Sequence, residues 1–321
     1  DGSGVTFGDL APGGISDVRI TSNVAPAQVT VDAETTNYTF SGNGAIIGST
    51  SLEKSGSGTL TINTANKYTG GTVISGGTVI SNNLSGLGTG SISVSGTGAV
   101  KIGGDGTLAN NITLKDAGSK LYLIGGGDIQ LSSTVTGDGS MTVAMDSQNK
   151  VVTVDGSKTY AGGTTIEKGT LSISALDALG TGDITINGGK LLVNANGTFE
   201  YTILGGENDG GVLEFGKGAA SAATNYNKGL TGNLALIYSG TSDLNIKTAA
   251  LITGNNYTYT GGTWINSGRL MWGSGSQATT GAPTYRLGTG AISIANSATL
   301  YIHFGGTKGS YTDRVLVPNA I

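Results

Sequence analysis

One phrase recurs three times in the chain, as YTGGTVISGGTVI from Tyr68, YAGGTTIEKGTLSI from Tyr160 and YTGGTWINSGRLMW from Tyr259. Self-similarity at long intervals is typical of repeat architectures, in which one short unit is stacked many times. The 321 residues are therefore expected to form one continuous repetitive body over 1–321 rather than unrelated domains. The internal repeats are expected at approximately 56–102, 137–193 and 240–302, with an irregular insert at approximately 195–240.

Apolar residues alternate with polar ones inside each copy. When the copies are aligned on their glycine pairs, Ile74, Ile166 and Ile265 fall in register, and a second phrase, LGTG, follows. A period of two places every second side chain on one face of a strand. The alternating apolar pairs are Leu60/Ile62, Ile92/Val94, Val100/Ile102, Met141/Val143, Ile184/Ile186, Leu191/Val193, Leu244/Ile246, Ile292/Ile294 and Leu300/Ile302.

Composition agrees with short strands joined by tight turns. Glycine supplies 58 residues and charged groups only 12%, and Val, Ile, Ser and Thr fill most of the strand positions. A short strand with one apolar face buries that face only if successive turns of the chain stack, which predicts an all-β solenoid. An antiparallel β-sandwich is the alternative fold, and it is disfavoured because Asn-Gly or Asp-Gly pairs do not recur at hairpin spacing.

Strand parity assigns side chains to the two faces. Ile74 and Val79 are expected in the core, with Tyr68 and the threonines of the phrase on the outside, and strand parity sorts the tryptophans of the third copy. In the third copy it places Trp264 outside and Trp272 inside. Trp264, together with Tyr259 and Tyr285, which are close to it in the sequence, is therefore a candidate contact for a glycan or a protein partner, because aromatic rings stack on sugars and pack at interfaces.

The sequence offers little for catalysis. It has no cysteine and a single histidine, His303, so a nucleophilic triad would depend on that one residue. We predict no catalytic residues, no metal ligands and no cofactor. The alternative is a carbohydrate-active β-helix enzyme, a polysaccharide lyase or hydrolase, which would need clustered acids beside a base such as Arg269 or Arg286.

The charge balance bears on partners and location. The net charge of −4 and the absence of a basic cluster disfavour nucleic acid as a partner. No apolar run is long enough to span a bilayer as a helix. The first residues, DGSGVTFGDL, do not read as a signal peptide, so we expect any export signal to be absent from this chain.

The residues from Tyr38, YTFSGNGAIIGSTSLEKSGSGTLTINTANKYTGGTVISGGTV, followed by LGTGSISVSG, resemble the autotransporter-associated β-strand repeat. The resemblance implies a right-handed parallel β-helix displayed at a bacterial surface or outside the cell, acting as a stalk, an adhesin or a fibril-forming subunit. Neither end of the sequence reads as a solenoid cap. We therefore expect self-association end to end, or continuation into a longer repeat chain.

Overall fold

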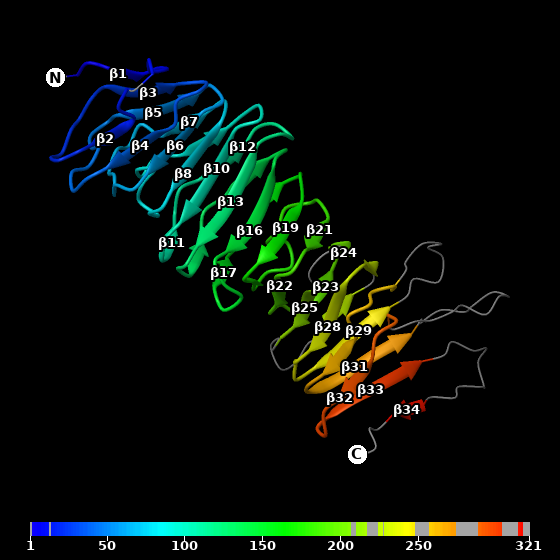
Figure 1. Cartoon of the computed structure of the whole chain (residues 1–321). Helices are drawn as coiled ribbons and strands as arrows, with labels where there is room; N and C mark the ends of the chain where they lie inside the picture. The colour runs from blue at the N-terminus through cyan, green and yellow to red at the C-terminus, as the bar shows by residue number, and fades with distance from the viewer. Residues whose placement is uncertain are drawn as a thin grey trace. The chain divides into compact units, whose positions relative to one another are not determined.

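The computed structural model describes residues 2–12, 14–206, 210–216, 224–226, 228–247, 257–273, 288–303 and 314–316. It divides into two compact units, of which the first is Asp1–Thr165 with Leu179–Gly182 and the second is Ile166–Ala178 with Asp183–Ile321. The described residues contain strands and no helix, so no helical segment among them could cross a membrane (Figure 1).

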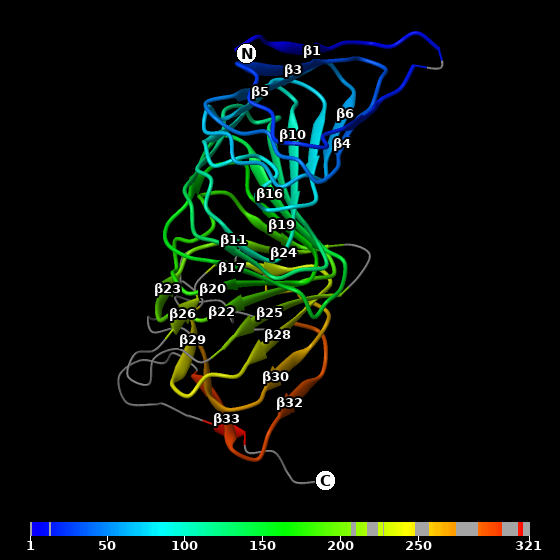
Figure 2. The same cartoon turned by 90° about the vertical axis from the view of Figure 1, so that its left-hand side faces the viewer.

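The first unit is a stack of coils whose strands line up in three sheets (Figures 1 and 2). The first sheet runs in the order β1 (Val5–Phe7), β3 (Gln28–Asp32), β5 (Ser51–Ser55), β7 (Thr72–Ile74), β9 (Ile92–Val94), β12 (Ile112–Leu114), β15 (Val135–Gly137) and β18 (Thr159–Tyr160). The second runs β2 (Asp17–Arg19), β4 (Tyr38–Ser41), β6 (Thr59–Ile62), β8 (Thr78–Ser81), β10 (Ala99–Gly103), β13 (Lys120–Gly125) and β16 (Ser140–Met145). The third comprises β11 (Gly106–Leu108), β14 (Ile129–Leu131) and β17 (Val151–Val154).

β19 (Thr164–Lys168) contains the division between the units. In the second unit one sheet runs β20 (Thr170–Ile173), β22 (Lys190–Val193), β25 (Gly211–Phe215), β28 (Leu234–Tyr238), β30 (Thr263–Ile265) and β32 (Ile292–Ile294). Another comprises β21 (Ile184–Ile186), β24 (Ile203–Gly205) and β27 (Leu230–Thr231). The last comprises β23 (Gly197–Phe199), β26 (Thr224–Tyr226), β29 (Asp243–Lys247), β31 (Gly268–Gly273), β33 (Ala298–His303) and β34 (Arg314–Leu316).

Parallel pairing identifies the fold. Within each unit the described coils pair in parallel, for example Leu60 with Val79 and Leu191 with Leu213, and the antiparallel exception is β33 with β34. Sequential strands of a hairpin sandwich would be antiparallel neighbours, whereas here each strand pairs with one from the next coil. The prediction of an all-β solenoid is confirmed, and the alternative sandwich is wrong.

Columns of stacked apolar side chains fill the interior. In the second sheet, Leu60, Val79, Val100, Leu121 and Met141 occupy successive coils in register, and all are fully buried. The alternation along each strand is regular, as in β16, where every second side chain is buried. The period-two pattern of the sequence therefore becomes a continuous core, because parallel strands about 4.8 Å apart bring equivalent positions into contact.

The repeat tyrosines lie inside, which corrects the expectation that they are exposed. Tyr68, Tyr160 and Tyr259 are fully buried. Each lies just before the glycine pair at a corner of its coil, where Tyr160 is the last residue of β18 and Tyr68 lies between β6 and β7. The threonines Thr72, Thr164 and Thr263 are also buried. Thr72 lies two residues before Ile74 on β7 and shares its inward face, so its assignment to the outside was wrong as well.

The LGTG phrase covers the tyrosine of its own repeat. Gly88 has φ +65°, and a Cβ atom added there would lie 2.3 Å from the carbonyl oxygen of Tyr68 and 2.8 Å from its ring. The next residue, Thr89, donates its backbone N–H to that carbonyl at 2.9 Å. Only glycine combines this positive φ with so close an approach. The two phrases of the repeat therefore form one packing unit.

Candidate functional site

The three aromatic residues expected to form a contact surface are placed differently by the structure. Trp264 lies on the outer face of β30, and 37% of its surface is exposed. Tyr259 is fully buried and therefore cannot meet a ligand at the surface, so its assignment to an exposed face was wrong. Tyr285 and the side chain of Trp272 lie outside the described residues.

Trp264 belongs to an outward column of side chains in the second unit. In parallel register, Ile237 on β28 lies beside it on one side and Ser293 on β32 on the other. Its indole lies against Gly262, since a Cβ atom added to that glycine would be 3.1 Å from Cη2 of the ring. The half-buried Ile237 and the indole together form an apolar strip on the outer face of this sheet, of the kind that supports stacking of a sugar or a flat apolar group.

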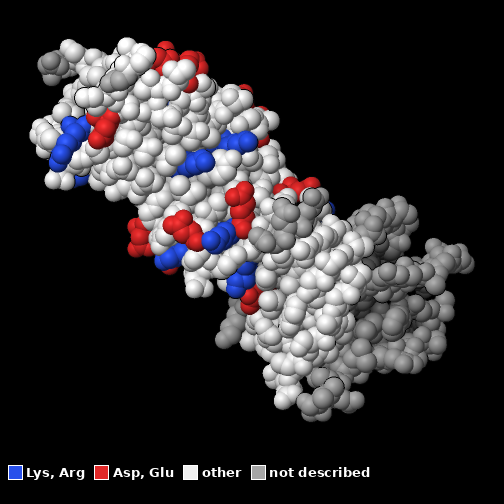
Figure 3. All heavy atoms as spheres, in the orientation of Figure 1, with Lys and Arg blue, Asp and Glu red and all other residues white. Residues whose placement is uncertain are grey.

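Charges beside this strip are paired. Glu214, the register partner of Ile237, accepts from Nζ of Lys190 at 3.1 Å. On the face shown in Figure 3, acidic and basic side chains are few and interspersed, without a continuous patch of either sign. Beside the strip, Lys190 balances the charge of Glu214, so an uncharged ligand surface suits the strip better than a polyanion does.

The arrangement at Arg269 does not favour an acid-base site. Its guanidinium makes a two-point contact with Asp243 on the neighbouring strand, at 2.9 Å from Nε and 2.5 Å from Nη2. The hydrogen bond and charge of Asp243 raise the pKa of the Arg269 guanidinium further, so it remains a cation held by its neighbour. Arg286 and the side chain of His303 lie outside the described residues. Among the described residues, no group of three or more acidic or histidine side chains could hold a metal ion.

Asp9 is an acid whose pKa is lowered by hydrogen bonds from the backbone. Its carboxylate accepts the backbone N–H groups of Glu34, Thr35 and Thr36, at 3.2, 2.9 and 2.9 Å. These donors, with that of Thr35 first, hold the pKa of Asp9 well below its usual range. A general acid needs a raised pKa, so the geometry assigns Asp9 to fastening the first coil onto the second.

Lys54 is a buried cation that sequence reasoning missed. Its ammonium donates to the carbonyl oxygens of Ser55 and Gly56, the latter at 2.8 Å. Burial lowers the pKa of Lys54, an effect opposed by the charges of Asp32 and Glu34. Parity with Leu52 on β5 was the available signal, because both side chains face inward. The ammonium closes the polar corner of its coil, where carbonyl groups of the turn would otherwise lack donors.

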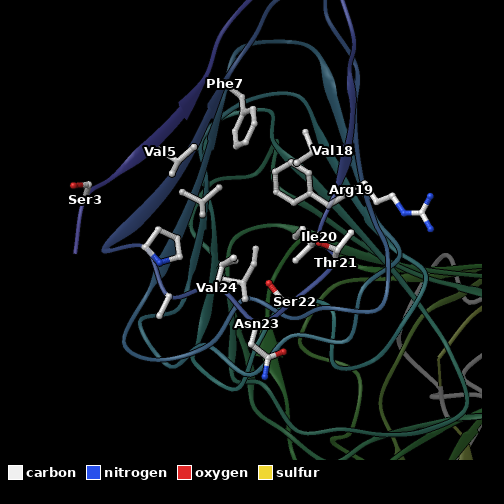
Figure 4. A pocket seen from close by; sticks show the side chains of 15 residues that line it. Ser3, Val5, Phe7, Val18, Arg19, Ile20, Thr21, Ser22, Asn23 and Val24 are labelled. Carbon is white, nitrogen blue, oxygen red and sulfur yellow. The ribbon is translucent and has the colours of Figure 1, made fainter. Parts of the chain in front are cut away.

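A cavity of about 660 Å³ lies at the N-terminal end of the first unit. Its lining comes from β1, β2 and the strands beneath them, and the labelled side chains of Val5, Phe7 and Val18 point into it (Figure 4). Most of the remaining wall is apolar, including Val29 and Phe40. Sequence reasoning did not identify this cavity, because its walls come from separate segments of the first coils whose contact the sequence pattern does not give.

Comparison with known proteins adds independent information. The model of the passenger-associated-transport-repeat matches residues 52–80, 151–173 and 248–271. A relative described as the adhesin BmaC autotransporter of Brucella suis biovar 1 (strain 1330) is 32% identical over 162 residues. That alignment covers 50% of this chain but only 5% of the relative. No solved structure matches the chain.

The first two matched segments coincide with architecture already described. Residues 52–80 run from β5 through the buried Tyr68 to β8, and residues 151–173 run from β17 through the buried Tyr160 to β20. The third segment ends with β30 and most of β31. The chain is thus a β-solenoid in which three segments match the passenger-associated-transport-repeat.

Proposed function

We propose that the chain is a non-catalytic structural part of a bacterial surface protein, which acts as a stalk or adhesin and associates with itself through its ends. The observation that carries this proposal is the repeat itself. Its most distinctive residues, Tyr68, Thr72 and Gly88, are used for packing rather than for presenting chemistry. The transport-repeat match and the adhesin relative support a location at the cell surface or outside the cell.

The absence of activity is tested directly. The purified chain is incubated with a panel of neutral and uronate polysaccharides, and new reducing ends and unsaturated uronates are measured over time. We expect neither to accumulate. Accumulation that is lost on Arg269→Ala, with folding unchanged, would establish the carbohydrate-active enzyme instead.

A second candidate function is recognition of neutral glycans by the strip formed by Trp264 and Ile237. The observation that favours it is the position of Trp264, an exposed ring resting on Gly262 in an otherwise regular sheet. The first repeat carries Val73 at the equivalent position, between Thr72 and Ile74, and this residue is 42% exposed. The repeats therefore supply their own matched control.

The glycan experiment compares two substitutions. Beads coated with the chain are tested for binding to immobilised neutral glycans. Trp264→Ala should reduce retention about tenfold, because it removes an aromatic packing surface that contributes on the order of 1.4 kcal/mol. Val73→Ala should leave retention unchanged. Equal retention of both variants and the original chain would remove Trp264 from the binding surface while leaving the structural role intact.

A further inference from the structure

The N-terminal end of the first unit exposes an unusual amount of apolar surface. Of the eight large apolar side chains that are exposed among the described residues, four lie within the first 24 positions, namely Val5, Leu10, Ile15 and Val24. Ile15 is 82% exposed. The cavity of about 660 Å³ opens at this same end. A sheet end with apolar side chains and a hollow core is the kind of surface that proteins cover.

β2 supplies an unpaired strand edge at this end. Among the described strands it pairs with β4 alone. Toward β4, the carbonyl of Ser16 accepts from Thr39 N and the N–H of Ile20 donates to Ser41 O, at 3.0 and 2.7 Å. Peptide groups alternate between the two edges of a strand. The peptide groups of Asp17 and Arg19 therefore face away from β4, as donors and acceptors for another strand.

The sequence of this edge is complementary to itself. Asp17 and Arg19 flank Val18, and both are exposed. Val18 and Arg19 are both at the wall of the cavity, but the side chain of Arg19 extends away from it (Figure 4). In an antiparallel pair centred on Val18, Asp17 of one copy lies opposite Arg19 of the other, and the reverse contact occurs on the other side of the axis. In this register the free N–H and C=O groups of Asp17 in one copy lie opposite those of Arg19 in the other copy. Each such pair of opposite residues can exchange two backbone hydrogen bonds.

We propose that two copies of this chain associate head to head through β2, as a two-fold dimer whose central contacts are the reciprocal Asp17 and Arg19 pairs. A two-fold arrangement is the commonest symmetry of soluble oligomers and requires a surface that complements itself. Opposite charges directly across an antiparallel pair stabilise it, whereas like charges destabilise it. A copy added in parallel, in the same register, would place Asp17 against Asp17 and Arg19 against Arg19. The charges therefore select the antiparallel copy as the occupant.

This dimer is one specific form of the self-association in the proposed function, and it rests on that proposal. It differs from end-to-end stacking in the assembly that it produces. A head-to-head contact closes on itself, so this end yields pairs rather than an open-ended filament. It also brings two apolar cavity mouths, each with Val5 and Val24, toward one another and away from water. The glycan strip at Trp264 belongs to the second unit and takes no part in it.

The test exchanges charges on the edge. Sedimentation velocity over a range of concentrations should show a dimer for the original chain. Asp17→Arg alone and Arg19→Asp alone should each weaken dimerisation at least about tenfold, because each replaces two attractive cross-strand pairs by repulsive ones. A mixture of the two variants in equal amounts should form a heterodimer, since the two arginines of one variant then face the two aspartates of the other across the axis.

Matched controls make the same charge changes elsewhere. Glu53→Arg on the outer face of β5 and Lys115→Asp after β12 should leave the dimer unchanged. A monomeric original chain at all concentrations, or single variants that dimerise as well as the original, would overturn the proposal. A mixture that stays monomeric would overturn it too. Trp264→Ala should not alter sedimentation, so loss of glycan binding and loss of dimerisation are distinguished.

Discussion

The phenolic oxygen of Tyr68 lies 2.7 Å from the hydroxyl oxygen of Thr72, four residues later. The same buried pair recurs as Tyr160 with Thr164 and as Tyr259 with Thr263. A buried hydroxyl is costly without a partner, so each threonine completes the burial of the tyrosine that precedes it. The phrase YxGGT therefore encodes an aromatic core residue together with its hydrogen-bond partner.

Removing the hydroxyl tests this pairing. Tyr68→Phe should lower the free energy of unfolding by about 1–3 kcal/mol, because the Thr72 hydroxyl loses its close partner in the core. Denaturant titration of the folded chain measures the change. Tyr122→Phe is the control, since that half-buried ring keeps its contact with Lys101, whose Nζ lies 5.0 Å from the centroid. It should change stability by less than about 0.5 kcal/mol. Equal effects of the two substitutions would contradict the role of the pair.

The close packing of Gly88 against Tyr68 can be tested with two glycine-to-alanine substitutions. Gly88 and Gly156 have almost the same φ, +65° and +68°, but at Gly156 no heavy atom beyond its two chain neighbours lies within 4 Å of the Cβ position. Gly156→Ala should cost only the backbone strain of about 1–2 kcal/mol. Gly88→Ala adds a clash with Tyr68 and should cost at least about 2 kcal/mol more. Thermal unfolding followed by circular dichroism compares them. Similar losses would show that the φ angle alone demands glycine at Gly88.

Burial of the repeat tyrosines predicts sensitivity to alkali. Burial raises the pKa of Tyr259 from its usual 10.0 to about 12. The folded chain then keeps a proton that the unfolded chain loses, so this contribution to stability is present below pH 10 and is lost as the pH rises to about 12. The slope approaches about 1.4 kcal/mol per pH unit for this group. Melting temperatures measured across this range should fall less steeply for Tyr259→Phe.

The substitution Thr263→Val tests how the hydrogen bond with Thr263 affects the pKa of Tyr259. The hydrogen bond from Thr263 lowers the pKa of Tyr259, in opposition to burial. Its removal should move the phenolate transition, followed by absorbance, to higher pH. A transition at the pH of free tyrosine in either background would contradict burial of the ring.

Asn66 fastens three successive coils. Its Oδ1 accepts from Ile46 N at 2.9 Å and its Nδ2 donates to Gly86 O at 2.7 Å, and the side chain is 1% exposed. Asn66→Asp keeps the shape but loses the donor and buries a carboxylate, so it should destabilise the chain by at least about 2 kcal/mol. Denaturant midpoints report the loss. Asn82→Asp, at an exposed contact with Asn63, should be nearly neutral, and an equally large loss there would argue against a special role for Asn66.

Strand positions were predictable because a period of two is set by backbone geometry. Leu60 and Ile62 follow it, and both are fully buried. Repetition of the glycine phrases then favoured stacked coils over a sandwich. The corners were not predictable in this way, because a residue between two strands has no fixed parity. Tyr68 was misplaced for that reason.

The candidate site was predicted in part. Trp264 faces out as parity required, since it lies between the inward Thr263 and Ile265 on β30. The adjoining Ile237 could not be named from the sequence, because the register between β28 and β30 depends on a connecting segment of irregular length. The proposed pairing of Asp17 in one copy with Arg19 in the other could not be inferred from the sequence either. It depends on β2 having one strand neighbour, β4, among the described strands.

Asn66 also has a bearing on how the chain can fold. Its side-chain bonds to adjacent coils reach residues 20 positions away on either side, while Asn82 reaches back 19 residues to Asn63 and Tyr38 reaches back 30 to Gly8. In a chain of 321 residues these are short separations. Loop closure at such distances costs little more for the last coil than for the first. Each new coil can therefore dock on the finished one before it, so the chain can acquire its structure progressively from one end as it emerges, without waiting for the rest of the sequence.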